Sequence, residues 1–349
     1  MPQHEVGYRP WNGQTTAQAG RWRIITDTGF RLVFKSMWVR RLLFLAWLPI
    51  FYFGTIFFIL ENPDILGPQK SAQNQGGMME ALDKVKNAAM RDENVRRNSL
   101  RNFLQNLPDG QILAEQITSG SPEEQRHALW SFLLMTFFRY PQATMIIFLL
   151  GFISPGLISR DFRSRAFLLY FSRPIGRIEY ILGKLAIPSI YLMLVTTFPA
   201  LVLYVLGVSM SPDLSVIPLT WDIPLRILVA SAILIIPCSA LSLMLSSLTQ
   251  ESRFASFAWF AVWVLGHGAW TAVWMGAIRG KQQLGEALVD PSIRRWEFLS
   301  LYNNLGRAQS WIFGLDTLQN ALPALCILAF VTILSFIVLF RRVSGPIRI

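Results

Sequence analysis

Six stretches of almost continuous apolar residues divide the chain, and polar or charged stretches separate them. A helix needs about 20 mostly apolar residues to cross a hydrocarbon layer of roughly 30 Å, because only a helix or a closed barrel satisfies its backbone hydrogen bonds in lipid. The pattern therefore predicts an all-α integral membrane protein with six transmembrane helices. The predicted spans are residues 42–60, 143–159, 185–208, 223–248, 254–278 and 321–340.

Residues 1–41 form a polar tail followed by apolar positions with helical spacing. These positions are Phe30, Val33, Phe34, Met37 and Trp38. Arg31 and Lys35 lie on the opposite face, so the pattern predicts an amphipathic helix in the membrane interface. Alternatively, this stretch is only the segment that leads into the first span, and this explains the same spacing equally well.

The polar stretch 61–142 is too long to be only a connector, and we expect a helical loop outside the membrane. Ser121 and Glu124 have the spacing of a capping box, and Pro122 suits the first helical position. The helix that begins there leads into the second span. The loop is interpreted either as a helical lid on the outer face or as a solvent-exposed loop without a functional role.

Prolines and aromatic residues mark the later spans and the loop 279–320. Pro188, Pro199 and Pro237 lie inside predicted spans, where each removes a backbone hydrogen bond and predicts a kink. The loop 279–320 mixes charges with aromatic residues, which favours short helices that lie on the outer leaflet or dip into it.

Composition and charge place the chain in a membrane. Apolar residues make up 52% of the chain, the mean hydropathy is +0.39, and the net charge of +11 comes from 32 Lys/Arg against 21 Asp/Glu. The basic excess lies in 1–41, 160–184 and 341–349, which six spans would place on one side. Short loops rich in Lys and Arg stay cytoplasmic, so we expect a multi-pass protein of the inner (cytoplasmic) cell membrane with both termini cytoplasmic. This placement argues for a lipid surface and against nucleic acid as the partner of the charge.

Catalytic and metal-binding motifs are absent from the sequence. The pairs Gly183-Lys184 and Gly280-Lys281 lack the first glycine of a phosphate-binding loop. The three histidines lie in different regions, and the two cysteines each lie inside a predicted span, so neither forms a ligand cluster. We therefore expect no enzyme activity, no catalytic or metal-binding residue and no cofactor in this chain.

The fifth predicted span carries an unusual stripe of aromatic side chains. The stripe consists of Trp259, Trp263, His267 and Trp270, followed by Trp274. Aromatic side chains bind varied apolar shapes, so the stripe is a possible path for an amphipathic or aromatic substrate. Packing against lipid or neighbouring helices is the alternative, with His267 bonded to a backbone carbonyl.

The segment 156–184 is a basic hinge between the second and third spans. In chain order it consists of a charged cluster at 160–165, a short apolar helix at 166–171, a Ser-Arg-Pro-Ile turn at 172–175, and a second short helix that ends in Gly183-Lys184. We interpret it as a loop that presents a small helix to a soluble partner.

This order resembles the cytoplasmic loop of type-2 ABC transporter permeases, in particular the multicopper-enzyme-maturation permeases. Members typically have an acidic-basic cluster, a short apolar helix, a Leu-Ser-Arg-Pro-Ile-Ser-Arg turn and a Gly-Lys pair that opens the next span. The matching residues here are Arg160, Asp161, 167–171, 172–177 and Gly183-Lys184. The cluster has one acid where members often have two or more, and the first outer loop is unusually long.

The resemblance implies the membrane-spanning permease subunit of an ATP-driven transporter, with an exporter expected. Such a subunit pairs with a separate ABC ATPase subunit, which would hold ATP-Mg, and with a second permease copy as a homodimer or with a homologous permease. The segment 160–184 is then expected to dock on the ATPase. The expected coupling residues are Arg160, Asp161, Arg163, Arg165, Phe167, Leu168, Phe171 and Arg173.

Within that set, Phe167, Leu168 and Phe171 are expected to make apolar contacts, and arginines such as Arg163 and Arg165 to pair with charges on the ATPase. The arginines could instead bind anionic lipid head groups and fix the topology.

A function from another class is also consistent with the sequence. In that alternative the chain is a membrane anchor or assembly factor that recruits a partner through its outer helical loop, without transport.

Overall fold

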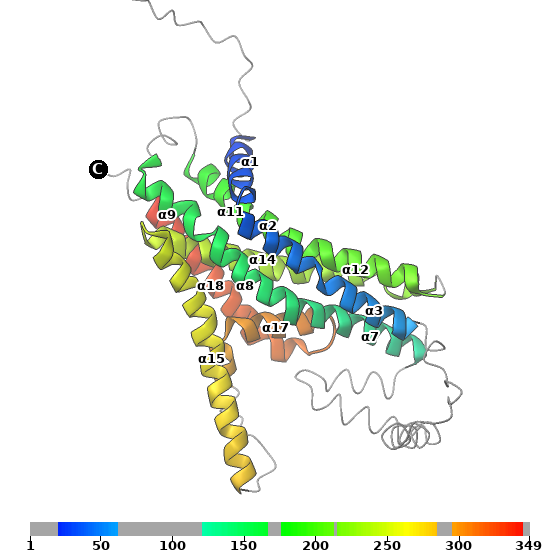
Figure 1. Ribbon diagram of the computed structural model, residues 1–349. Helices are drawn as coiled ribbons and strands as arrows, with labels where there is room; N and C mark the ends of the chain where they lie inside the picture. Colours follow the sequence, from blue (N-terminus) through cyan, green and yellow to red (C-terminus); the bar gives the residue numbers. More distant parts are fainter. Residues whose placement is uncertain (1–19, 62–120, 167–175, 213–214, 285–294, 345–349) are drawn as a thin grey trace, which may run out of the picture.

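The computed structural model describes residues 20–61, 121–166, 176–212, 215–284 and 295–344, and these parts of the chain form helices and connecting turns without a strand. The long apolar helices run roughly side by side, α1 stands at an angle to them at one end, and α15 diverges from them toward its C-terminal end (Figure 1). The elements are α1 (Arg21–Phe34), α2 (Met37–Trp47), α3 (Pro49–Glu61), α7 (Pro122–Phe137), η3 (Phe138–Gln142), α8 (Ala143–Ile153), α9 (Pro155–Arg163), α11 (Arg177–Val195), α12 (Thr197–Met210), α13 (Val216–Leu219), α14 (Ile223–Leu248), α15 (Ser252–Leu284), η4 (Arg295–Leu299), α17 (Leu301–Ile312) and α18 (Leu318–Ser344).

Within the described residues, five helical segments are long and apolar enough to cross a membrane, as expected of a multi-pass membrane protein. They are Met37–Phe58, Glu123–Arg163, Arg177–Met210, Ile223–Leu248 and Leu318–Ser344. The helix α15 covers the fifth predicted span but is not among the five. The count of six spans therefore stays a prediction.

The second span belongs to a helical segment that is much longer than residues 143–159. Glu123–Arg163 contains 41 residues, or roughly 60 Å of helix, which is about twice the thickness of a hydrocarbon core. The π-helix η3 interrupts its regular winding at Pro141, where the missing N–H and the ring are incompatible with an ordinary turn. Part of this segment must therefore extend beyond the membrane core if it spans the membrane, and that α7 is this part stays a prediction.

The amphipathic stretch before the first span is divided between two helices. Helix α1 begins at Arg21 and ends at Phe34, and Ser36 has the extended backbone (φ −66°, ψ 124°) that separates it from α2. Met37 and Trp38 therefore belong to the candidate span, not to the interfacial helix that the spacing predicted. That α1 lies in the membrane interface stays a prediction.

The intramembrane prolines have different effects. Helices α11 and α14 continue through Pro188 and Pro237. The third span divides at Thr196, between α11 and α12. This break lies one turn before Pro199, whose lack of an N–H leaves the carbonyl of Val195 without its helical partner.

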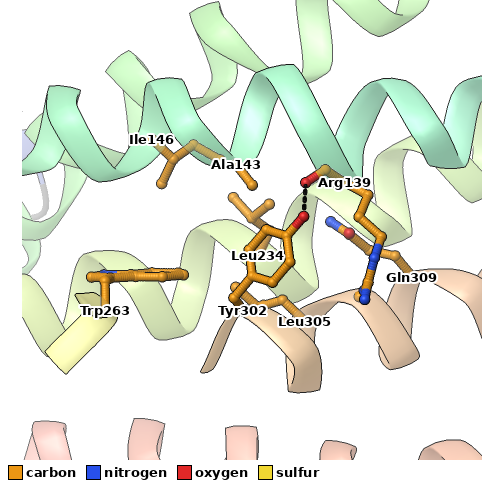
Figure 2. A pocket seen from close by; sticks show the side chains of 9 residues that line it. Arg139, Ala143, Ile146, Leu234, Trp263, Tyr302, Leu305 and Gln309 are labelled. Atoms are coloured by element: carbon orange, nitrogen blue, oxygen red, sulfur yellow. Dashed lines mark hydrogen bonds between the residues drawn. The ribbon is translucent and has the colours of Figure 1, made fainter. Parts of the chain in front are cut away.

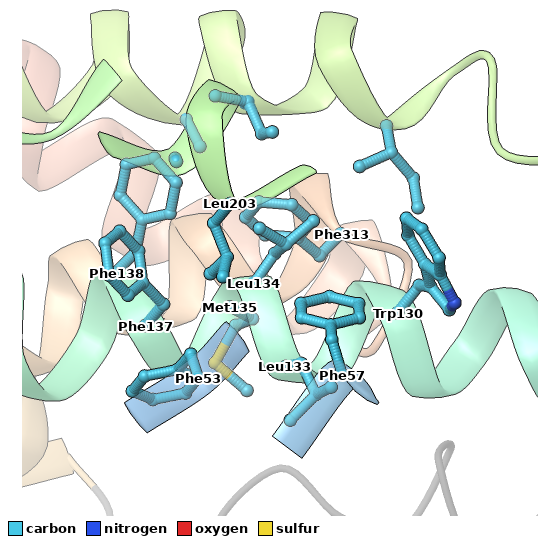
Figure 3. Close-up of a cluster of buried hydrophobic side chains, with 14 of the residues drawn as sticks. Phe53, Phe57, Trp130, Leu133, Leu134, Met135, Phe137, Phe138, Leu203 and Phe313 are labelled. Carbon is cyan, nitrogen blue, oxygen red and sulfur yellow. The ribbon is translucent and has the colours of Figure 1, made fainter. Parts of the chain in front are cut away.

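Two apolar clusters hold the opposite ends of the bundle. At one end, called the α1 end, Ile25 of α1 is buried in the same cluster as Ile158 of α9, Ile181 of α11 and Val343 of α18. The N-terminal helix and the end of the last span therefore lie at the same end of the molecule, as an even number of spans requires. At the other end, the α7 end, buried aromatic side chains of α3 and α7 pack with α12 and the turn after α17 (Figure 3).

A buried carboxylate joins three helices at the α7 end. Glu61, at the end of α3, accepts hydrogen bonds from Arg126 and Trp130 of α7 and from Ser211 after α12. The Trp130 Nε1–Glu61 Oε1 distance is 2.7 Å. Burial alone would raise the pKa of Glu61, but the hydrogen bonds and the charge of Arg126 outweigh it and lower the pKa below its ordinary value of 4.5.

A second set of charges lies at the same end. Asp222, before α14, bonds to His127 Nε2 of α7 at 2.9 Å and to Arg226 Nε at 2.6 Å. Arg226 Nη1 also donates to the carbonyl oxygen of Ile312 at the end of α17. Its charge is therefore held by the protein and does not need to reach the membrane surface.

Helix α17, within the predicted outer loop, is buried in the bundle. Its buried residues include Asn303, Asn304, Arg307 and Gln309, and it packs on α14, α15 and α18. Arg307 pairs with Glu297 at 2.6 Å and with Asp316 at 3.8 Å. The loop thus supplies part of the polar interior, which the mixed charge of its sequence did not reveal.

We expect Arg126→Met to lower the free energy of unfolding by about 3 kcal/mol at pH 7, because it leaves the Glu61 charge buried without its main partner. Thermal unfolding in detergent measures the effect. The exposed pair Arg31–Asp27 provides the control, since Arg31→Met should change stability by less than about 1 kcal/mol. Equal effects of the two substitutions would contradict the assignment.

The lowered pKa of Glu61 makes this contribution dependent on pH. It is fully present above the ordinary pKa of 4.5 and is lost as the pH falls through the lower pKa of the folded protein. Glu61→Gln should therefore lose less stability than the unsubstituted protein between pH 5 and pH 3. Parallel loss of stability in the two proteins would show that other groups dominate acid unfolding.

Candidate functional site

A buried ion pair joins the two ends of the predicted coupling segment. Asp161, near the end of α9, lies 2.7 Å from Lys184 Nζ of α11, and both side chains are largely buried. Tyr180 donates its hydroxyl hydrogen to the same carboxylate oxygen at 2.8 Å. The side chain of Asp161 is therefore used inside the protein, where it fixes α9 on α11. Its part in coupling to an ATPase stays a prediction.

Helix α1 packs against the start of α11 at Gly183. A Cβ atom at this position would lie 2.9 Å from the carbonyl oxygen of Trp22 and from the Cβ of Ile25, so only glycine permits this separation. Thr26 donates to the carbonyl oxygen of Gly183 at 3.1 Å, and Tyr191 donates to that of Phe30 at 2.9 Å. The two residues of the Gly-Lys pair therefore have different roles. Gly183 lets α1 pack closely on α11, and Lys184 binds α9 through its ion pair with Asp161.

Ser246 of α14 connects the same region to the fourth span. Its hydroxyl donates to the carbonyl oxygen of Pro155 at 2.7 Å and accepts from the N–H groups of Ile158 and Ser159, both at 3.2 Å. These groups belong to the first turn of α9, where the helix restarts after Ser154. A single serine thus fixes α14 to the junction between α8 and α9.

The arginines of the charged cluster face outward at the α1 end. Arg160, Arg163 and Arg165 are exposed, and Arg163 Nη1 lies 3.4 Å from Glu251 Oε1. Arg165 has a φ of 54°, a left-handed conformation that turns the chain away from α9. The short loop 249–251 between α14 and α15 therefore contributes to this surface through Glu251. Sequence reasoning had not assigned this loop to the site, and its only signal was a charged stretch between two predicted spans.

The predicted coupling residues are thus only partly located. Arg160, Asp161, Arg163 and Arg165 lie at the α1 end, whereas Phe167, Leu168, Phe171 and Arg173 lie outside the described residues. We use the name coupling surface for the exposed Arg160, Arg163 and Arg165 together with the half-buried Glu251.

The aromatic stripe of α15 divides into a buried and an exposed part. Trp259 and Trp263 are 1% and 4% exposed, their rings lie 5.5 Å apart, and Trp259 Nε1 donates to the carbonyl oxygen of Ile147 at 2.8 Å. His267 is exposed and contacts the ring of Tyr302 at 4.8 Å, while Trp270 is half-buried and stacks on Trp274. The four residues proposed for a substrate path therefore face different surroundings.

A small cavity lies beside the buried part of the stripe (Figure 2). Its volume is about 10 Å³, about the space that one water molecule needs. Tyr302 donates its hydroxyl hydrogen to the carbonyl oxygen of Arg139 at 3.0 Å. The lining residues are Arg139, Ala143, Ile146, Leu234, Trp263, Tyr302, Leu305, Gly306 and Gln309. Across the described parts of the chain, no group of three or more His, Cys, Asp or Glu side chains could hold a metal ion.

The comparison with protein families agrees with the resemblance of the coupling segment. The model of the ABC-2 family transporter protein matches residues 35–344, which include every candidate span. No curated protein and no solved structure showed a significant match to the chain. A match over most of the chain, together with several apolar spans and the hinge at 156–184, identifies a membrane permease subunit of an ABC transporter. The chain belongs to the ABC-2 family of transporter proteins.

Proposed function

We propose that this permease is an exporter subunit that a separate ATPase drives through the coupling surface at the α1 end. In this proposal the α1 end is cytoplasmic, and ATP and Mg²⁺ bind in the ATPase. A second permease copy completes the transporter. The exposed apolar side chains of α15 and α18 offer surface to lipid and to such a copy.

The observation that carries the proposal is the connection between the coupling surface and the spans. The Asp161–Lys184 pair joins α9 to α11, Ser246 joins α9 to α14, and Gly183 seats α1 on α11. A displacement applied to residues 160–176 therefore acts on three spans and on α1 together. Close-packed interiors transmit such displacements because they are difficult to compress.

The chemistry of the surface fits a protein partner with acidic and apolar groups. Arg160 and Arg165 present their charges outward, and Glu251 leaves most of the Arg163 side chain exposed at 68%. We propose that these arginines pair with carboxylates of the ATPase, while Phe167, Leu168 and Phe171 enter an apolar groove. Apolar anchors near the centre of an interface usually contribute most of its affinity, and charges at the rim contribute orientation and association rate.

Substitution of an apolar anchor tests the docking. We expect Leu168→Asp to weaken binding of the ATPase about 30-fold or more, which corresponds to the roughly 2 kcal/mol of an interface hot spot. The measurement is the ATP hydrolysis that co-elutes with the tagged permease from detergent-solubilised membranes. Leu299→Asp introduces the same change at an exposed residue of η4 and should leave co-elution unchanged. Normal co-elution with the Leu168 variant would refute the docking site.

Substitution of the buried pair tests transmission separately from docking. Lys184→Met should leave ATPase co-elution intact but lower stability by about 3 kcal/mol and reduce the ATP turnover of the complex, because it strands the Asp161 carboxylate. The double variant Asp161→Asn/Lys184→Met removes both charges and should recover most of the stability. Turnover should stay low in the double variant, since α9 and α11 are no longer held by a charge pair. Normal turnover in both variants would contradict the transmission route.

A further inference from the structure

Arg139 is a buried cation on the π-helix η3. Its side chain is only 9% exposed, although arginine is almost always exposed or paired. Arg139 and Arg160 lie on the same long helical segment, separated by roughly 30 Å at about 1.5 Å per residue. This separation equals about one hydrocarbon thickness, so Arg139 lies near the membrane boundary opposite the coupling surface.

Two carboxylates in the segments that flank α17 are already paired with another arginine. Glu297 and Asp316 both pair with Arg307. Within the described residues Arg139 has no ion pair, and its guanidinium lies 5.2 Å from the centre of the Tyr302 ring. A cation–π contact offsets only part of the cost of burying a charge.

Three hydrogen-bond donors among the residues that line the cavity have no acceptor in the described protein. They are Arg139 Nη1, Gln309 Nε2 and Trp263 Nε1. Arg139 and Gln309 approach each other from η3 and α17 beside this cavity (Figure 2). Buried polar groups are normally paired, so a positively charged cluster of donors calls for an acceptor from outside the chain.

Gly306 of α17 makes room for the guanidinium. A Cβ atom at this position would coincide with Arg139 Nη1, and the adjacent Cζ would also be too close. Arg139 therefore lies directly over the backbone of α17, a packing that any larger residue at position 306 would prevent. The close packing against Gly306 therefore fixes the position of the Arg139 side chain.

We propose that Arg139 and Gln309 bind an anionic hydrogen-bond acceptor in this cavity. The space of about 10 Å³ admits a group of one-atom width, either a halide ion or a single oxygen of a phosphate or carboxylate. Arg139 and Gln309 both line this cavity, and their Nη1 and Nε2 atoms have no acceptor among the described residues. Trp263 and Leu234 line the same cavity. The location near the membrane boundary suits either a dissolved anion or the head group of an anionic amphipathic molecule.

Ligand-dependent thermal stability of the purified permease tests the proposal without the ATPase, so its outcome does not depend on the coupling surface. A ligand that binds only the folded state raises the unfolding temperature. One arm compares sodium chloride with sodium gluconate at constant ionic strength, since gluconate is too large for the cavity. The other arm, in gluconate, compares bilayers of phosphatidylcholine with bilayers that contain phosphatidylglycerol.

We expect at least one arm to raise the unfolding temperature of the native chain, and Arg139→Gln and Gly306→Ala to abolish that rise. Gln309→Leu should weaken the apparent affinity about 10-fold by removing one donor. Arg31→Gln, which removes an exposed positive charge on α1, is the matched control and should keep the full response.

The two arms identify the source of the acceptor. A response to chloride that requires Arg139 assigns a dissolved anion, and a response to phosphatidylglycerol alone assigns a lipid-like head group. Gly306→Ala and Gln309→Leu retain the arginine, so they remain informative if Arg139→Gln fails to fold. Responses that are absent from the native chain, or that persist in both of these variants, would overturn the proposal.

Discussion

A charged side chain that is buried away from water needs a partner inside the protein. This requirement constrains how the helices of the bundle pack against one another. Glu61 finds its partners on two other helical segments at the α7 end, and Asp161 finds Lys184 at the α1 end. In each case the paired residues are far apart in the chain. Such pairs cannot form until the helices are correctly placed, so they select one arrangement of helices that apolar packing alone would leave less specific. Arg139 is the exception, because its charge is buried and forms no ion pair with any residue that the structure describes.

Small residues allow the close approaches that these charges need. Gly183 lets α1 lie against α11, and Gly306 lets the Arg139 guanidinium lie against α17. Ser246 contributes in a different way, since its hydroxyl replaces helical hydrogen bonds at the junction between α8 and α9. Small polar residues suit membrane bundles because lipid offers helices no hydrophobic reason to associate. The contacts that connect the spans are therefore short, polar and specific.

The two proposed functional regions lie on one continuous helical segment. The coupling surface lies at its α9 end, and Arg139 lies on the π-helix roughly 30 Å away. A π-helix is a rare distortion that tends to occur at functional sites, since its extra residue can shift along the helix at low cost. Movement of α9 by an ATPase would therefore reach the packing of Arg139 on α17 through α8, which only Ser154 separates from α9. The proposed anion site and the proposed ATPase docking site at the coupling surface therefore lie on connected helices. Each proposal has its own test.

The apolar blocks of the sequence determined the fold class and most of the spans, because a membrane helix satisfies its backbone locally and its apolar length is visible in the chain. The hinge at 156–184 likewise carried the family resemblance, which a family match over 35–344 confirms. Tertiary structure decided which polar residues are buried. The sequence placed Asp161 in the coupling segment but did not reveal that its carboxylate pairs with Lys184. Nor did it reveal that α17, from the predicted outer loop, is buried in the bundle. A side chain's partner depends on how helices distant in sequence pack together, and residue spacing within one helix does not contain that information.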